Sequence, residues 1–82
     1  MTLSKEQVAL NLGRRLREIR LQKGLSMENV AAYSDMEYIQ LSRIELGKIN
    51  TSVYQVYKIS VTLSEPLHTI FQPIAEEKNG DQ

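Results

Sequence analysis

Apolar residues recur at the period of an α-helix near the start of the chain. Val8, Leu12, Leu16 and Ile19 follow at intervals of four, four and three residues, which places them on one face. The positions between them are mostly polar or charged. The pattern predicts a helix over residues 4–23, with one face buried and the other in solvent.

A second, shorter helix is predicted directly after the first. Gly24 suits the left-handed conformation that often ends a helix, and Ser26 is a favourable N-cap residue. The new helix should span residues 27–34. Val30 and Ala31 are expected to face inward.

A tight turn and a third helix should follow. Asp35 tolerates the left-handed turn conformation better than most residues. Gly47 is placed to end the next helix. Residues 37–46 between them are predicted to be helical, with Leu41 and Ile44 facing inward.

The segment 53–63 allows two interpretations. It is rich in β-branched residues, which also suit a strand. Its apolar positions nevertheless fall at helical intervals, at Val53, Val56, Ile59 and Leu63. The spacing favours a fourth helix, capped by the polar loop 50–52.

Two prolines delimit the predicted fifth helix. Pro66 is placed for its first turn, and Pro73 is expected to stop it, so that the helix would end near Phe71. We therefore expect one compact all-α domain of five helices over residues 1–73. A polar C-terminal tail over residues 74–82 should follow it.

Composition and charge limit the possible partners. The 82 residues include no cysteine, which excludes disulfides and thiolate metal sites and suits a reducing cytoplasm. No apolar run approaches the length of a membrane span. The formal net charge is zero, which opposes nucleic-acid binding because phosphate contacts need Lys and Arg. However, residues 14–58 hold eight basic and five acidic residues, whereas the segment after Pro73 holds one basic and three acidic residues.

No constellation of residues suggests catalysis. His68 is the only histidine, and with no cysteine or second histidine to share a metal ion it is expected to lie on the surface. The carboxylates are scattered and form no paired acid and base. The sequence therefore predicts a protein that is not an enzyme and has no cofactor, no metal and no small-molecule substrate.

The most informative segment is 24–47. Here a short helix, a tight turn and a second short helix directly follow a basic helix, and a helix of this kind fits the major groove of DNA. Specific motifs accompany this arrangement in a fixed order. They are Leu12-Gly13-x-x-Leu16-Arg17-x-x-Arg20, Lys23-Gly24-Leu25-Ser26, Ser42-Arg43-Ile44-Glu45-x-Gly47-Lys48, and Asn50-Thr51-Ser52 followed by Lys58-Ile59 and Leu63.

In this order and spacing, the motifs resemble the Cro/CI-type (XRE, lambda-repressor-like) helix-turn-helix family over residues 10–71. The resemblance implies a compact five-helix lambda-repressor-like domain that binds double-stranded DNA. It also implies a homodimer that binds an inverted-repeat operator and regulates transcription. Such a protein would act in the cytoplasm of a bacterium or for a phage, in association with the nucleoid.

The resemblance further implies which residues contact DNA. Base contacts are expected near the start of the third helix and one turn further on, at Tyr38, Ile39, Ser42 and Arg43. Arg43 is the leading candidate because a guanidinium can bond both guanine acceptors, and Ile39 is suited to a thymine methyl group. Phosphate contacts are expected at the start of the second helix and after the third, from Ser26, Met27, Lys48, Asn50, Thr51, Ser52 and Tyr54.

Three residues depart from the family pattern and leave the contact set open. Met27 stands where the family usually has Gln, Glu37 replaces a small N-cap residue, and Asp35 occupies a position that is often Gly. Glu37 and Asp35 put negative charge close to the expected DNA surface. Arg20 and Glu45, by contrast, match family positions that form a structural ion pair between the first and third helices.

Each candidate also has a purely structural interpretation. Arg43 would then be a solvated surface charge, Ile39 a core or interface residue, and Tyr38 an ordinary surface tyrosine. Tyr54 and Tyr57 lie three residues apart and would pack in the core. The functional alternative gives Tyr54 a phosphate contact and Tyr57 a place at an interface.

The last predicted helix carries more apolar residues than so small a core needs. Exposed apolar residues often mark interfaces, so we expect a twofold dimer through the fifth helix and the end of the fourth. A dimer would place two recognition helices about 34 Å apart, which is one turn of DNA. The predicted interface residues are Val61, Leu67, Ile70, Phe71 and Ile74.

The sequence thus predicts a sequence-specific DNA-binding transcriptional regulator. A restriction–modification controller, an antitoxin and a phage-type repressor all fit so small a chain. The alternative is a helical protein-interaction module that keeps the fold without binding DNA. The neutral net charge, Asp35 and Glu37 favour that alternative, whereas Arg43 and the basic first helix oppose it.

Overall fold

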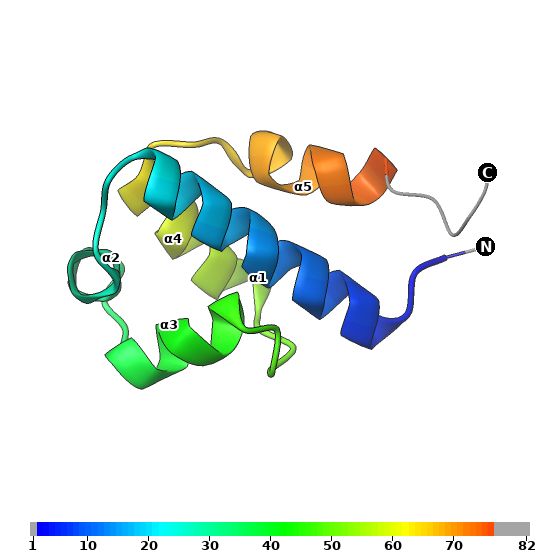
Figure 1. Cartoon of the computed structure of the whole chain (residues 1–82), viewed down its shortest axis with the longest axis horizontal. Helices are drawn as coiled ribbons and strands as arrows, with labels where there is room; N and C mark the ends of the chain where they lie inside the picture. Colours follow the sequence, from blue (N-terminus) through cyan, green and yellow to red (C-terminus); the bar gives the residue numbers. More distant parts are fainter. Residues whose placement is uncertain (1, 77–82) are drawn as a thin grey trace.

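Five helices pack around one hydrophobic core in the computed structural model, which describes residues 2–76 (Figure 1). In order along the chain they are α1 (Lys5–Gln22), α2 (Met27–Tyr33), α3 (Tyr38–Glu45), α4 (Val53–Leu63) and α5 (Leu67–Glu76). Residues 2–76 include no strand, and the β-branched segment 53–63 is helical throughout. The prediction of an all-α fold with five helices is confirmed.

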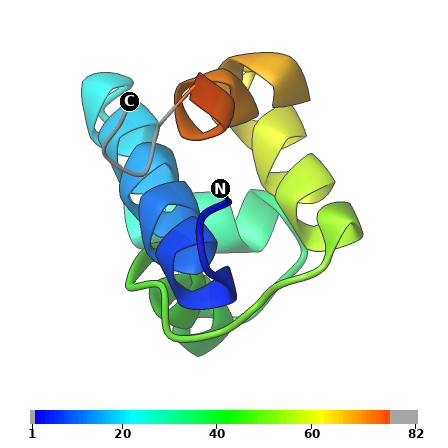
Figure 2. The same cartoon turned by 90° about the vertical axis from the view of Figure 1, so that its right-hand side faces the viewer.

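The long helix α1 lies at the centre of the helix packing. It packs against α3 on one side and α5 on another, while α2 contacts both α3 and α4. Figures 1 and 2 show α5 and α3 on opposite sides of α1, so that α3 lies along one outer edge of the molecule. This arrangement leaves one side of α3 open to solvent.

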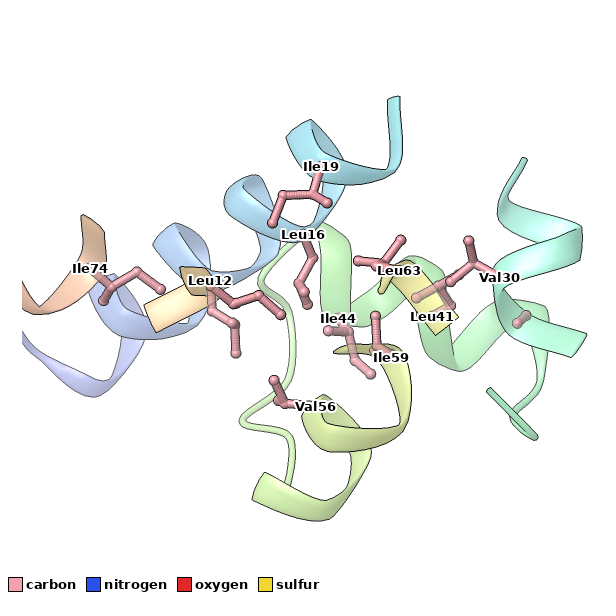
Figure 3. Close-up of a cluster of buried hydrophobic side chains, with 12 residues drawn as sticks. Leu12, Leu16, Ile19, Val30, Leu41, Ile44, Val56, Ile59, Leu63 and Ile74 are labelled. Carbon is pink, nitrogen blue, oxygen red and sulfur yellow. The ribbon is translucent and has the colours of Figure 1, made fainter. Parts of the chain in front are cut away.

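Every helix contributes to the core (Figure 3). Because α2 has seven residues and α3 has eight, neither is long enough to be stable alone, and both depend on this packing. The buried apolar residues of the described part are Leu12, Leu16, Ile19, Val30, Ala31, Leu41, Ile44, Val56, Ile59, Leu63, Ile70 and Ile74.

Serine residues cap three of the helices at their N-termini. The hydroxyl groups of Ser4, Ser26 and Ser52 each accept a hydrogen bond of 3.1 Å from the backbone amide three residues further on. Such a cap contributes about 1 kcal/mol of stability. The N-cap residue of α3 is Glu37, and its side chain makes no capping hydrogen bond.

The first four helices end in the same way. In each, one residue with positive φ follows the helix, and the backbone amides of that residue and the next bond carbonyls of the last turn. The residues with positive φ are Gly24, Asp35, Gly47 and Ser64, with φ of 68°, 53°, 71° and 56°. The left-handed turn predicted at Asp35 is therefore confirmed, and Ser64 adds a position that the sequence did not reveal.

Gly13 sets the close approach of α1 to α3. It is buried, and a Cβ atom at this position would lie closer than 3.0 Å to the backbone carbonyl oxygens of Ile44 and Glu45. These are backbone atoms at the end of α3, so they cannot move aside as a flexible side chain can. The absence of a side chain at Gly13 is therefore required for this packing.

A buried ion pair fixes the same two helices. Arg20 Nε lies 2.7 Å from Glu45 Oε2, and Arg20 Nη2 lies 3.0 Å from Glu45 Oε1, which confirms the predicted pair. Arg20 Nη1 also donates to the carbonyl of Leu25, 3.0 Å away. The hydrogen bond to Glu45 raises the pKa of Arg20 above its ordinary value, although burial acts in the opposite direction. The charged guanidinium therefore bonds both carboxylate oxygens of Glu45 on α3 and the carbonyl of Leu25 in the loop before α2.

The fifth helix is longer than predicted. It continues through Pro73 to Glu76 instead of ending near Phe71, so the expectation that Pro73 stops it is wrong. Ile74, which the prediction assigned to the polar tail, is only 8% exposed and packs in the core. Burial of this side chain favours the extra turn. Residues 77–82 of the predicted tail lie outside the described residues.

A contact from α1 offsets the backbone defect that Pro73 creates. Proline has no N–H, so it cannot bond the carbonyl of Thr69 four residues earlier. The guanidinium of Arg15 donates to that carbonyl instead, with an Nη2–O distance of 3.4 Å. The helix can therefore pass through the proline because a side chain from α1 supplies the missing donor.

Replacing Gly13 by Ala tests the close approach of α1 and α3. Alanine normally stabilises a helix interior by about 1 kcal/mol relative to glycine. Here the clash with the α3 carbonyls should reverse the sign and lower the free energy of unfolding by about 1–3 kcal/mol. Thermal unfolding followed by circular dichroism should show a drop of about 4–8 °C for each kcal/mol. Gln22→Ala on exposed α1 surface is the control, and an unchanged midpoint for Gly13→Ala would contradict the packing argument.

Replacing Arg20 by Met tests the ion pair. This variant leaves the Glu45 carboxylate buried without its partner, so we expect stability to fall by about 3–5 kcal/mol in urea denaturation. The double variant Arg20→Met/Glu45→Leu removes both charges and should recover most of that loss. Equal instability of the single and double variants would show that the unpaired charge is not the cause.

Candidate nucleic-acid interface

The turn between α2 and α3 is held by backbone hydrogen bonds. The amide of Asp35 bonds the carbonyl of Ala32 at 3.2 Å, and the amide of Met36 bonds the carbonyl of Ala31 at 3.0 Å. The side chain of Met36 packs against the core. Figure 1 shows α2 end-on while α3 runs across the view, and the bonded turn fixes these two directions relative to each other. The turn and the packing between the two helices therefore define their relative orientation.

The outward face of α3 carries two of the predicted base-contact residues. Leu41, Ile44 and Glu45 are buried, whereas Ile39 is 53% exposed and Arg43 is exposed. Residues four apart in a helix differ by about 40° in direction, so Ile39 and Arg43 share one face. The guanidinium of Arg43 makes no hydrogen bond or ion pair within residues 2–76. Its five donors are therefore free for an external partner.

The other two predicted base-contact residues flank this face. Tyr38 is 49% exposed at the start of α3, and Ser42 is half-buried one turn further on. The exposure of Ile39 shows that its interpretation as a core residue is wrong. The same holds for Tyr54 and Tyr57, which are both at least half exposed, with stacked rings whose centroids lie 6.3 Å apart.

The predicted phosphate contacts divide into free and engaged groups. The hydroxyls of Ser26 and Ser52 already accept capping hydrogen bonds from backbone amides, so each retains only its own O–H to donate. The side chain of Met27 packs against the core, so the phosphate contact predicted for this residue would come from its backbone amide. Lys48 and Asn50, in contrast, are exposed in the loop after α3.

A groove beside this loop adds a residue that the sequence did not reveal. It lies between the first turns of α1 and the α3–α4 loop, where Thr51 is half-buried. Lys5 and Lys48 line it together with Glu6 and Asn50. Lys5 is distant from the helix-turn-helix in sequence, so only the packing of α1 brings it next to Lys48.

The fourth helix holds the turn between α2 and α3 in place. Lys58 Nζ donates to the carbonyl of Asp35 at 3.1 Å and lies 5.3 Å from the centre of the Tyr54 ring. The hydroxyls of Ser34 and Thr62 share a hydrogen bond of 2.8 Å. The spacing of four residues between Tyr54 and Lys58 suits the ring contact, whereas the bond from Lys58 to Asp35 is not predictable from local sequence.

The predicted dimer surface is smaller than expected. Ile70 is 0% exposed and Ile74 is 8% exposed, so both belong to the core of the single chain and are not available to a partner. They lie on the side of α5 that packs against α1. The excess of apolar residues that suggested an interface is therefore partly buried within the single chain. Val61 remains 60% exposed on α4, and Leu67 and Phe71 are only partly buried.

The exposed groups on and beside α3 are suited to binding another molecule through hydrogen bonds and apolar contacts. Within residues 2–76, no three histidine, cysteine or carboxylate side chains come together in a way that could hold a metal ion. None of the helices described is both long and apolar enough to cross a membrane. The α3 face instead combines a free guanidinium, a tyrosine hydroxyl and an isoleucine. These groups suit hydrogen bonds and apolar contacts with base edges in the major groove.

Comparison with known proteins agrees with this geometry. A helix-turn-helix family profile matches residues 16–70. The control protein C.MunI of a Mycoplasma species is 35% identical over 71 residues, which cover 85% of this chain and 96% of that protein.

Two solved structures are similar as well. The restriction–modification controller protein C.AhdI of Aeromonas hydrophila has a TM-score of 0.75 and 32% identity, over 77% of this chain and 96% of that one. A variant of the restriction–modification controller protein C.Esp1396I also has a TM-score of 0.75, over 95% of this chain and 100% of that one. At 20% identity, that second likeness concerns the fold alone.

The family profile covers most of the chain, from the middle of α1 to α5, and includes the whole α2–turn–α3 unit. The resemblance inferred from the sequence motifs is thereby confirmed. The chain belongs to the XRE-type helix-turn-helix family of DNA-binding transcription regulators.

Proposed function

We propose that this protein controls transcription in a restriction–modification system by binding an inverted-repeat operator. The observation that carries the proposal is the outward face of α3, where Ile39 and Arg43 are exposed and the guanidinium of Arg43 has no partner within residues 2–76. A recognition helix in the major groove contacts base edges with such residues. The names of C.MunI and C.AhdI, both more than 30% identical to this chain, favour a controller over an antitoxin or a phage-type repressor.

The groups around α3 would fix the protein on the phosphate backbone. Lys48 and Asn50 are exposed beside α3, and Tyr54 lies near the turn, where Lys58 holds its ring. The backbone amides at the start of α2, including that of Met27, supply further donors. Phosphate contacts set the register of a protein on DNA, while base contacts supply specificity.

The remaining apolar surface supports a homodimer. Val61 is 60% exposed on α4, and a groove joins Tyr57 and Val61 to Leu67 at the start of α5. Phe71 lies one turn further along α5. A twofold pair through this surface would present two α3 helices to successive major grooves and double the phosphate contacts. Doubling matters for a chain with no net charge.

Replacing Arg43 by Ala should relax sequence preference without changing the fold. A guanidinium bonded to one guanine contributes about 1–3 kcal/mol of discrimination at that base pair. Selection of bound duplexes from a random pool should therefore yield a motif that loses its preference at one position in each half-site. The circular dichroism spectrum should not change, because Arg43 makes no contact that supports the helix.

Arg14→Ala is the matched control, since Arg14 is exposed on α1 and its loss removes the same charge. Both variants should bind DNA more weakly at a given salt concentration, but only Arg43→Ala should change the selected motif. A selected motif that is identical for wild type and Arg43→Ala would refute the assignment of Arg43 as a base contact.

Replacing Val61 by Glu tests the dimer. The side chain is exposed in the single chain, so the variant should fold normally while a charge at the interface prevents association. Light scattering after gel filtration at micromolar concentration should give a dimer for the wild type and a monomer for Val61→Glu. A monomeric wild-type protein under these conditions would contradict the proposed homodimer.

A further inference from the structure

The helix α3 begins differently from the three serine-capped helices. The hydroxyls of Ser4, Ser26 and Ser52 bond the first backbone amides of α1, α2 and α4. At the corresponding position of α3, Glu37 has the same extended backbone, with φ −77° and ψ 149°, but its side chain makes no capping hydrogen bond. The side chain of Glu37 therefore does not supply the capping hydrogen bond that a serine would supply at this position.

The carboxylate of Glu37 has no partner in the described part of the chain. Glu18, Glu45 and Glu65 each form an ion pair, at 3.8, 2.7 and 3.1 Å. The side chain of Glu37 is exposed and makes neither a hydrogen bond nor an ion pair within residues 2–76. It directly precedes Tyr38, at the end of the helix that approaches base edges in a helix-turn-helix.

An unpaired carboxylate at this place is unfavourable unless DNA offers it a donor. Phosphates on both sides of the major groove repel it. The groove edges present two amino groups, cytosine N4 and adenine N6, and N6 stands beside the N7 acceptor, whose lone pair repels a carboxylate. Cytosine N4 is the donor that fits an acceptor-only side chain.

We propose that Glu37 recognises a cytosine in each operator half-site by accepting a hydrogen bond from its N4 amino group. This inference rests on the proposed function, because it requires α3 to enter the major groove. Glu37 then increases sequence specificity in two ways. It favours the operator through one base, and its charge weakens binding to every duplex that lacks cytosine at that position.

Selection of bound sites from a random duplex pool tests the assignment, with wild type, Glu37→Gln and Glu28→Gln treated in parallel. Glutamine has the same shape as glutamate but suits adenine, since its amide can bond both N6 and N7. For Glu37→Gln, the cytosine preference should fall by about tenfold at one position per half-site and shift towards adenine, with the other positions unchanged.

Glu28→Gln is the matched control because Glu28 is an exposed acid in the first turn of α2. It removes the same charge from the helix-turn-helix and should leave the selected motif unchanged. The melting temperature of Glu37→Gln should fall by no more than a few degrees, since no capping bond is lost and only a negative charge at the positive end of α3 is removed.

The possible results separate this inference from the proposed function. If wild type and Glu37→Gln select the same motif, the assignment of Glu37 is overturned while operator binding stands. If the wild type enriches no motif at all, the proposed function itself fails. A cytosine preference lost equally in both variants would show a general effect of charge and would also overturn the assignment.

Discussion

The placement of α3 depends on how closely α1 can approach its end. Gly13 allows contact between the helix backbones, and the bidentate pair of Arg20 and Glu45 joins the same two helices about two turns further along α1. Since α3 has only eight residues, it has no stability of its own and takes both its existence and its direction from this contact. The exposed face with Ile39 and Arg43 follows from that direction.

Much of the fold could be predicted because local signals agreed with one another. Serine caps, helical spacing of apolar residues and left-handed turns at Gly24 and Asp35 placed the boundaries of the first four helices within about one residue. The fifth helix could not be predicted in the same way, because a proline normally ends a helix. Its continuation depends on Arg15, a residue distant in sequence that supplies the donor that Pro73 lacks.

The residues of the candidate site on α3 could be predicted from local pattern, but the contacts between helices could not. Residues on α3 could be assigned from a short motif, and the helical period then separated exposed Arg43 from buried Ile44. Contacts between elements were not accessible from local pattern. Met27 turned out to pack against the core, and Ile70 joined the interior of the single chain because α5 lies along α1. Such outcomes are decided by three-dimensional packing.

Two hydrogen bonds connect α4 to the end of α2 and the turn that follows it. Lys58 bonds the carbonyl of Asp35, and Thr62 bonds Ser34. The same helix carries Val61 on its exposed side. A displacement of α4 would therefore act directly on the turn that precedes α3. Two such chains joined through α4 would hold their α3 helices at a set separation. Such a pair would tolerate little change in the spacing of the half-sites, even by one base pair.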